Sequence, residues 1–201
     1  MALNHVGNRR QAMKNIGFSA LLTMGLIVSS AQALAQELND TQLVRTLGRI
    51  ESAAPAIDIA LLVEEASANA GKGVVNLPNW QKLSKLSQLI VEIEFENDSV
   101  AIEPKSYRTV GLIADALHHP NLRRYKFLVV GHTNSTGDAK HNLELSAQRA
   151  NAITEALATT FAIKPDRLYS IGVGEEWPLD PANPKAAENR RVQLINLGLV
   201  K

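Results

Sequence analysis

Residues 131–150 read GHTNSTGDAKHNLELSAQRA and decide how the rest of the chain is interpreted. They follow the apolar run Phe127-Leu-Val-Val130 and lead into apolar positions at helical spacing, which predicts a buried strand, a polar loop and the start of a helix. The loop and the first helical turns gather Thr133, Asn134, Ser135, Asn142, Ser146 and Arg149. These groups recognise a polar ligand without attacking it chemically, so we interpret the stretch as part of a binding module.

The segments on either side predict an α/β domain. Apolar residues alternate with Glu92, Glu94 and Glu96, as in a strand with one buried and one solvated face. Further elements are expected as a helix from Pro104 to His118, a strand over 125–130, a helix ending near Thr160, and strands over 168–173 and 191–197. This order predicts a two-layer sandwich of βαβαβ type: a mixed four-stranded sheet with two main helices. The last strand is expected to be antiparallel, at an edge or next to the first.

Residues 36–88 are expected to form a helical or linker segment before this domain, which we place at 89–198. Asn39 has capping-box spacing to Gln42, which favours a short helix to about Ala53. Residues 56–70 are apolar enough for a helix or a strand, Val74-Val75 is a candidate for brief strand pairing, and 78–87 resembles a polar connector.

The first 35 residues have the pattern of a signal peptide. Arg9, Arg10 and Lys14 precede the apolar stretch 16–28, and Ala31-Gln-Ala-Leu-Ala35 offers small residues for cleavage after Ala35. An uncleaved anchor, a shorter signal from Met13 and a twin-arginine signal are the alternatives. Cleavage would leave 18 basic and 20 acidic residues, and we expect this mature chain in the periplasm or elsewhere in the cell envelope.

Composition excludes several classes of function. The 201 residues are 45% hydrophobic, with a formal net charge of +1 and no cysteine. There is no polybasic signature of nucleic-acid or anionic-membrane binding, and neither disulfides nor thiolate sites are possible. The chain also has too few alternating segments to form a transmembrane barrel.

The ordered motifs resemble the OmpA-like peptidoglycan-binding domain found in OmpA C-terminal domains, peptidoglycan-associated lipoproteins and flagellar stator proteins. The motifs that carry the resemblance are Phe95 with Asn97-Asp-Ser99; Gly131-His-Thr-Asn134 with Gly137; Asn142, Leu145-Ser146 and Arg149-Ala150; Arg167-Leu168; Gly172-Val-Gly-Glu175 with Pro178; and Asn189-Arg-Arg-Val192. The match covers about residues 89–198 and leaves the segment before it outside.

The resemblance implies non-covalent binding of peptidoglycan through diaminopimelate of the stem peptide. It places ligand-binding side chains at Arg149, Asn134, Thr133, Asn142, Asn97 and Arg190. An Arg guanidinium suits the ligand carboxylate, and an acid suits its ammonium.

This sequence has Asn134 where the family has Asp, and the lost charge is expected to weaken binding by about ten- to hundredfold unless Asp138 substitutes. The alternative is a scaffold or protein-interaction module with a weakened ligand site. If the chain is a wall-binding module, we expect residues 36–88 to contact an envelope partner that the module tethers or localises.

Other site types have little support in the sequence. The histidines at 118, 119, 132 and 141 lack the spacing of a zinc site. Gly172-Val-Gly174 lacks the third glycine and the helix of a dinucleotide fingerprint, and no G-x-S-x-G nucleophile motif occurs. We therefore expect no metal, no cofactor and no enzymatic activity.

Overall fold

The computed structural model describes residues 39–49, 56–96 and 99–199. The predicted signal peptide and the candidate ligand residue Asn97 lie outside these ranges. The helices are α1 (Asp40–Leu47), α2 (Ile59–Ala68), α3 (Pro78–Leu83), α4 (Tyr107–His118) and α5 (Ala139–Thr159), with short 3-10 helices η1 (Pro104–Ser106), η2 (Pro165–Arg167) and η3 (Ala187–Asn189). The strands are β1 (Gln88–Val91), β2 (Tyr125–Gly131), β3 (Leu168–Gly172) and β4 (Val192–Leu199).

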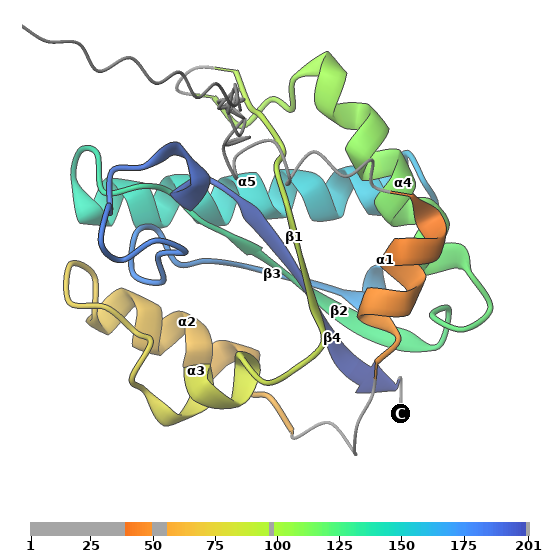
Figure 1. Cartoon of the computed structure of the whole chain (residues 1–201), viewed down its shortest axis with the longest axis horizontal. Helices are drawn as coiled ribbons and strands as arrows, with labels where there is room; N and C mark the ends of the chain where they lie inside the picture. The colour runs from red at the N-terminus through yellow and green to blue at the C-terminus, as the bar shows by residue number, and fades with distance from the viewer. Residues whose placement is uncertain (1–38, 50–55, 97–98, 200–201) are drawn as a thin grey trace, which may run out of the picture. The chain divides into compact units, whose positions relative to one another are not determined.

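The strands form one mixed sheet in the order β1-β4-β2-β3 (Figure 1). β2 and β3 are parallel, whereas β4 is antiparallel to both of its neighbours, β1 and β2. The predicted mixed four-stranded sheet is confirmed. Of the two positions left open for the last strand, the structure selects the one next to the first strand, in the interior of the sheet.

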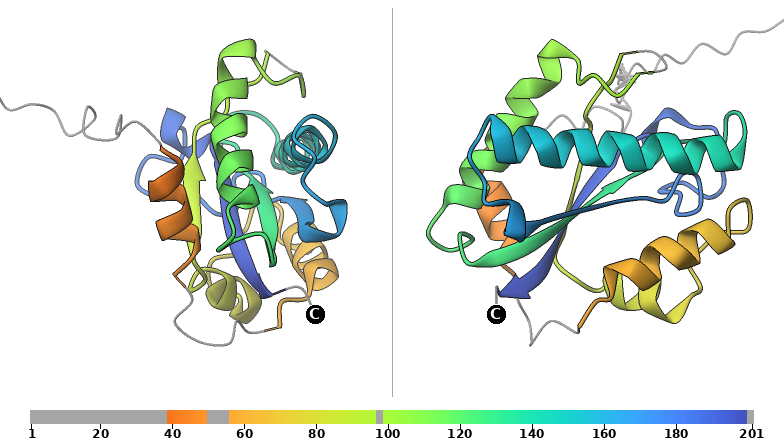
Figure 2. Two further views of the ribbon diagram at one scale, coloured as in Figure 1. Left: turned by 90° about the vertical axis from the view of Figure 1, so that its right-hand side faces the viewer. Right: turned by 180° about the vertical axis from the view of Figure 1, so that it is seen from behind.

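β2 is buried on both faces, which explains why its sequence is a continuous apolar run. Phe127 and Val129 belong to a core shared with α1, α4 and α5. Leu128 and Val130 point the other way, into a second core shared with α2 and α3. Figure 2 shows α5 lying across the sheet, while α2 and α3 lie together at a distance from α1 and α4 (Figure 1). The predicted packing of two main helices on the sheet is confirmed, and α2 and α3 add a second apolar contact to it.

The segment before the sheet is more regular than its sequence suggests. α1 begins as expected, with the Asn39 side chain accepting from the Gln42 main-chain N–H at 2.9 Å, but it ends at Leu47. The apolar stretch 56–70 forms the helix α2, and Val74-Val75 forms no strand. The expected polar connector contains α3, whose Trp80 and Leu83 are 1% and 0% exposed. Two apolar residues three positions apart are too few to reveal a helix by periodicity, but they suffice to bury one face.

β1 is shorter than its alternating pattern predicts. Its hydrogen bonding ends at Val91, which pairs with Val192, the first residue of β4. Beyond Val91 this segment makes no further strand pairing among the residues that the structure describes, apart from an isolated bridge between Phe95 and Ile102. The alternation of burial still continues, because Ile93 is 6% exposed. In the part of the chain covered by the structure, no helix has both the length and the apolar character needed to cross a bilayer.

Candidate functional site

A polar cavity of about 260 Å³ lies where β2 ends and β4 begins. Three arginines, three glutamates and one histidine contribute its polar lining: Arg149, Arg190, Arg191, Glu92, Glu94, Glu103 and His132. Ile93, Phe95, Gly131, Ala187 and Val192 complete the wall. The cavity therefore contains both signs of charge, carried by residues from the start, the middle and the end of the domain.

Close packing of α5 against the ends of β2 and β3 brings Arg149 to this cavity. A Cβ on Gly131 would lie 2.2 Å from the carbonyl oxygen of Ser146, so only glycine permits this approach. The Ser146 hydroxyl accepts a hydrogen bond from the Gly174 N–H at 2.8 Å and ties α5 to the loop after β3. Arg149 follows Ser146 by about one helical turn, so the same contacts fix the position of its side chain.

The loop after β1 orients the Arg149 guanidinium. Its Nε donates to the Ser99 carbonyl at 3.2 Å, and its central carbon lies 4.9 Å from the centre of the Phe95 ring. A cation over an aromatic face is stabilised by about 0.5–2 kcal/mol, depending on desolvation. Arg149 is thus held at the wall of the cavity, where the sequence analysis expects a carboxylate-binding arginine.

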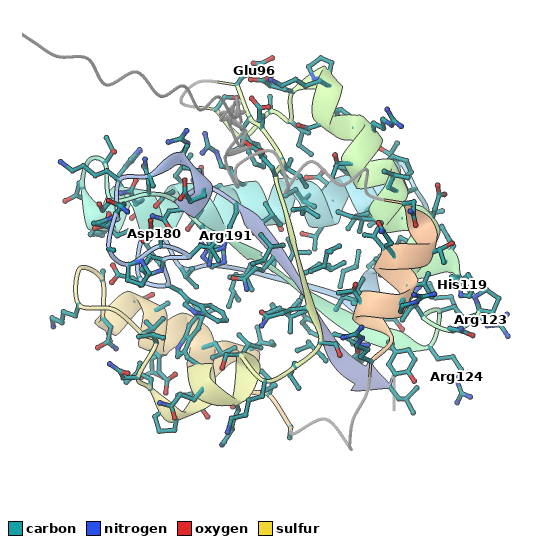
Figure 3. The ribbon with its side chains drawn as sticks, viewed as in Figure 1. Glu96, His119, Arg123, Arg124, Asp180 and Arg191 are labelled. Carbon is teal, nitrogen blue, oxygen red and sulfur yellow. The ribbon has the colours of Figure 1, made fainter. Side chains whose placement is uncertain are left out.

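Arg191, which the sequence analysis left without a ligand role, lies deeper than the favoured Arg190. Arg190 is exposed, whereas Arg191 is 5% exposed and lies within the fold in Figure 3. Arg191 donates to the carbonyl of Trp177 at 2.9 Å and to the side-chain oxygen of Gln193 at 3.2 Å.

No carboxylate among the described residues forms an ion pair with Arg191, and its Nε has no hydrogen-bond partner there. Burial lowers the pKa of Arg191 to about 10. A buried cation without a counter-ion is costly, so an anion entering the cavity would offset that cost. The sequence does place this arginine directly before a buried strand, but it contains no signal for the missing counter-ion.

His132 is the other buried polar group at the cavity. It is 4% exposed, and its ring centre lies 5.8 Å from that of Trp177. Burial, and then the charge of Arg191, hold the pKa of His132 well below its usual value. The Trp177 carbonyl and the Gln193 side chain partly oppose this shift, although neither completes a hydrogen bond of good geometry with the ring nitrogens. His132 is therefore a neutral ring with unused donor and acceptor capacity.

Thr133, Asn134 and Asn142 are not in the lining of the cavity. Thr133 and Asn134 lie in the loop after β2, and Asn142 lies in the first turn of α5. The Asn134 amide donates to the Lys185 carbonyl at 2.9 Å. The Asn142 amide donates to the carbonyls of Asn134 and Thr136 and to a Glu175 carboxylate oxygen, at 3.4, 3.1 and 2.7 Å. The Thr133 hydroxyl is buried without a hydrogen-bond partner among the described residues. The ligand roles of all three stay predictions.

Asp138, considered as a substitute for the missing acid, caps α5 instead. Its side chain accepts from the His141 N–H at 2.9 Å. The acids that do reach the cavity are Glu92, Glu94 and Glu103, which the sequence analysis treats as a solvated strand face or leaves out. Among the residues with assigned positions, no group of three potential ligands could hold a metal ion.

Comparison with known proteins identifies the same region. Residues 94–191 match the family model described as the OmpA family. Outer membrane porin F of Pseudomonas aeruginosa is 29% identical over 114 residues, which are 55% of this chain and 32% of that protein. Peptidoglycan-binding protein ArfA of Mycobacterium bovis is 32% identical over 106 residues, which are 51% of this chain and 31% of that protein. The chain thus spans about a third of the length of these curated relatives.

Solved structures also match. The peptidoglycan-associated lipoprotein of Burkholderia pseudomallei is 27% identical, with a TM-score of 0.43, and the alignment covers 61% of this chain and 98% of that one.

Proposed function

Because residues 94–191 match the model of the OmpA family, we propose that the chain binds peptidoglycan non-covalently through the cavity where β2 ends and β4 begins. The ligand group is diaminopimelate of the stem peptide, whose free end carries a carboxylate and an ammonium. The similarity to ArfA, a peptidoglycan-binding protein, supports this proposal.

The observation that carries the proposal is the set of three arginines around one cavity. Arg149 is held over Phe95, and Arg191 is buried without a carboxylate partner among the described residues. A planar guanidinium binds a carboxylate through two parallel hydrogen bonds, and such charge-assisted bonds are stronger than neutral ones. A ligand carboxylate would therefore supply the counter-ion that Arg191 lacks.

The proposal includes export to the cell envelope. The basic and apolar pattern of residues 1–35 supports a signal peptide cleaved after Ala35, which would release the chain into the periplasm. Residues 36–88 are proposed to support a partner contact. α2 and α3 pack on the sheet, so this contact would use their outer surfaces, where Leu61 and Val63 are 37% and 46% exposed.

The alternative function is a scaffold that retains the fold but has a weakened ligand site. It is favoured by Asn134, whose amide is used to hold the Lys185 carbonyl and which carries no charge for a ligand ammonium. Under this alternative the domain would not sediment specifically with the cell wall.

Sedimentation with purified sacculi separates the two functions. The wild-type chain, Arg149→Ala and the control Arg124→Ala would be compared at two salt concentrations. Arg124 is an exposed arginine at the far end of the domain (Figure 3), so its loss tests for non-specific attraction between charges. The proposal is supported if only Arg149→Ala loses binding and if the wild type and Arg124→Ala still sediment with sacculi at the higher salt. Sedimentation that is equal for all three proteins, or that disappears with salt, supports the scaffold.

A further inference from the structure

We propose that Glu94 and Glu103 form an ammonium-binding subsite of the cavity and that Lys105 occupies this subsite until a ligand ammonium displaces it. The inference rests on the proposed function. It names the ligand group as a zwitterion, with its carboxylate at the arginines and its ammonium at the glutamates. In this chain, two acids from a different segment would then take the role that the family's Asp has at the position of Asn134.

The unliganded domain already contains an ammonium bound at this place. The Lys105 Nζ lies 2.7 Å from a carboxylate oxygen of Glu94 and 3.1 Å from one of Glu103. These two hydrogen bonds, the one to Glu94 first, raise the pKa of Lys105. The side chain of Lys105 ends in a primary ammonium, the same chemical group that diaminopimelate presents. The two carboxylates therefore already have the spacing that this group requires.

Main-chain hydrogen bonds hold the two glutamates beside each other. The Glu103 N–H donates to the Glu94 carbonyl at 2.9 Å, and the Glu94 N–H donates to the Ser106 hydroxyl, also at 2.9 Å. The Lys105 side chain remains mobile enough to leave, because 60% of it is exposed and exposed ion pairs are weak. The main chain thus fixes the positions of the two glutamates, while the ammonium group bound between them can be exchanged.

A second observation at the cavity concerns its two buried polar lining residues, His132 and Arg191. The ring nitrogens of His132 and the Nε of Arg191 are buried without hydrogen-bond partners in the described structure, and both residues line the cavity. Buried polar groups are normally satisfied, so these two side chains keep unused hydrogen-bonding capacity beside the cavity.

The balance of charge favours a zwitterion over a simple anion. Three guanidinium groups and three carboxylates line the same cavity. A ligand with a carboxylate alone would satisfy the arginines and meet repulsion from the glutamates. A ligand carrying both charges on one carbon can satisfy both groups.

The test compares meso-diaminopimelate with pimelate, which has the same carbon chain without ammonium groups. Dissociation constants for both probes would be measured by NMR titration of the purified full chain. The proteins are the wild type, the double variant Glu94→Gln/Glu103→Gln, Lys105→Met and Arg149→Ala. The matched control is Glu96→Gln, because Glu96 is exposed on the same segment but does not line the cavity.

If the subsite exists, the double variant reduces the preference for diaminopimelate over pimelate by about two- to fivefold, the range for exposed ion pairs. Glu96→Gln leaves the preference unchanged, which excludes a long-range charge effect. Lys105→Met binds diaminopimelate more tightly than the wild type, because the competing ammonium is gone.

Two results overturn the inference alone, and a third overturns the proposed function with it. An unchanged preference in the double variant, with binding still lost in Arg149→Ala, refutes the subsite and leaves the proposed function intact. Weaker diaminopimelate binding by Lys105→Met would show that Lys105 assists the ligand instead of competing with it. Failure of the wild type to bind either probe refutes the proposed function and the subsite together.

Discussion

Replacing His132 by Phe should remove a large part of the acid sensitivity of the domain. In the folded state burial, followed by the charge of Arg191, lowers the pKa of His132, whereas the unfolded chain has an ordinary histidine pKa of about 6.5. As the pH falls below that value, the unfolded state takes up a proton that the folded state does not. Stability contributed by the neutral ring is therefore present above about pH 6.5 and is lost as the pH falls.

The size of this loss follows from the unfolded pKa alone, provided that His132 stays neutral in the folded domain. Between pH 7 and pH 5, protonation of one unfolded histidine lowers the free energy of unfolding by up to about 2 kcal/mol. Phe preserves the aromatic contact with Trp177, whose ring centre lies 5.8 Å from that of His132. At pH 7 we therefore expect the variant to be within about 1.5 kcal/mol of the wild type, as for other volume-conserving changes.

Urea denaturation at pH 7 and pH 5 measures the effect directly. The loss of stability between the two pH values should be smaller by up to about 2 kcal/mol in His132→Phe than in the wild type. His119→Gln, a change at an exposed histidine, is the control and should retain the acid dependence of the wild type. If His132→Phe loses as much stability as the wild type on acidification, the reasoning from burial is wrong.

Three further changes test contacts beside the site and elsewhere in the domain. Asn134→Asp removes the amide donor to the Lys185 carbonyl and should lower the free energy of unfolding by about 1–3 kcal/mol, measured by urea denaturation. Arg167→Met leaves three main-chain carbonyls without their donor and should cost about 3–5 kcal/mol, seen as a lower thermal midpoint; a cost below 1 kcal/mol would contradict the assigned hydrogen bonds. Trp80→Ala should cost about 3–5 kcal/mol and speed hydrogen exchange in α2 and α3; unchanged exchange would refute their packing on the sheet.

Much of the fold is predictable because it depends on local patterns. The apolar run of β2 predicts a buried strand, and the helical spacing after Pro104 and after the loop that follows β2 predicts α4 and α5. α3 is missed because it has two apolar residues in a polar context. The end of β1 is missed because the alternation of apolar and polar residues indicates only which side chains are buried. The hydrogen bonds of this edge strand depend instead on where its partner, β4, begins.

The candidate site is predictable only in part. The motifs resembling the OmpA family identify Arg149 and Arg190, and both line the cavity. They include Arg191 without giving it a ligand role, and they do not include Glu92, Glu94 or Glu103. Glutamates that alternate with apolar residues are predicted to face solvent, and nothing in this pattern indicates that they line the same cavity as an arginine from α5.

The sequence by itself therefore determined the order of strands and helices along the chain, the resemblance to the OmpA family and the arginine of α5, because periodicity and motif spacing are properties of neighbouring residues. Tertiary structure decided which charges share a cavity. Pairing of β4 with both β1 and β2 brings Arg191 to Gly131 and to the glutamates of the β1 segment, although they lie far apart in the chain. Burial of Arg191 without a carboxylate partner among the described residues exists only in the folded domain, since desolvation depends on what surrounds a group in space.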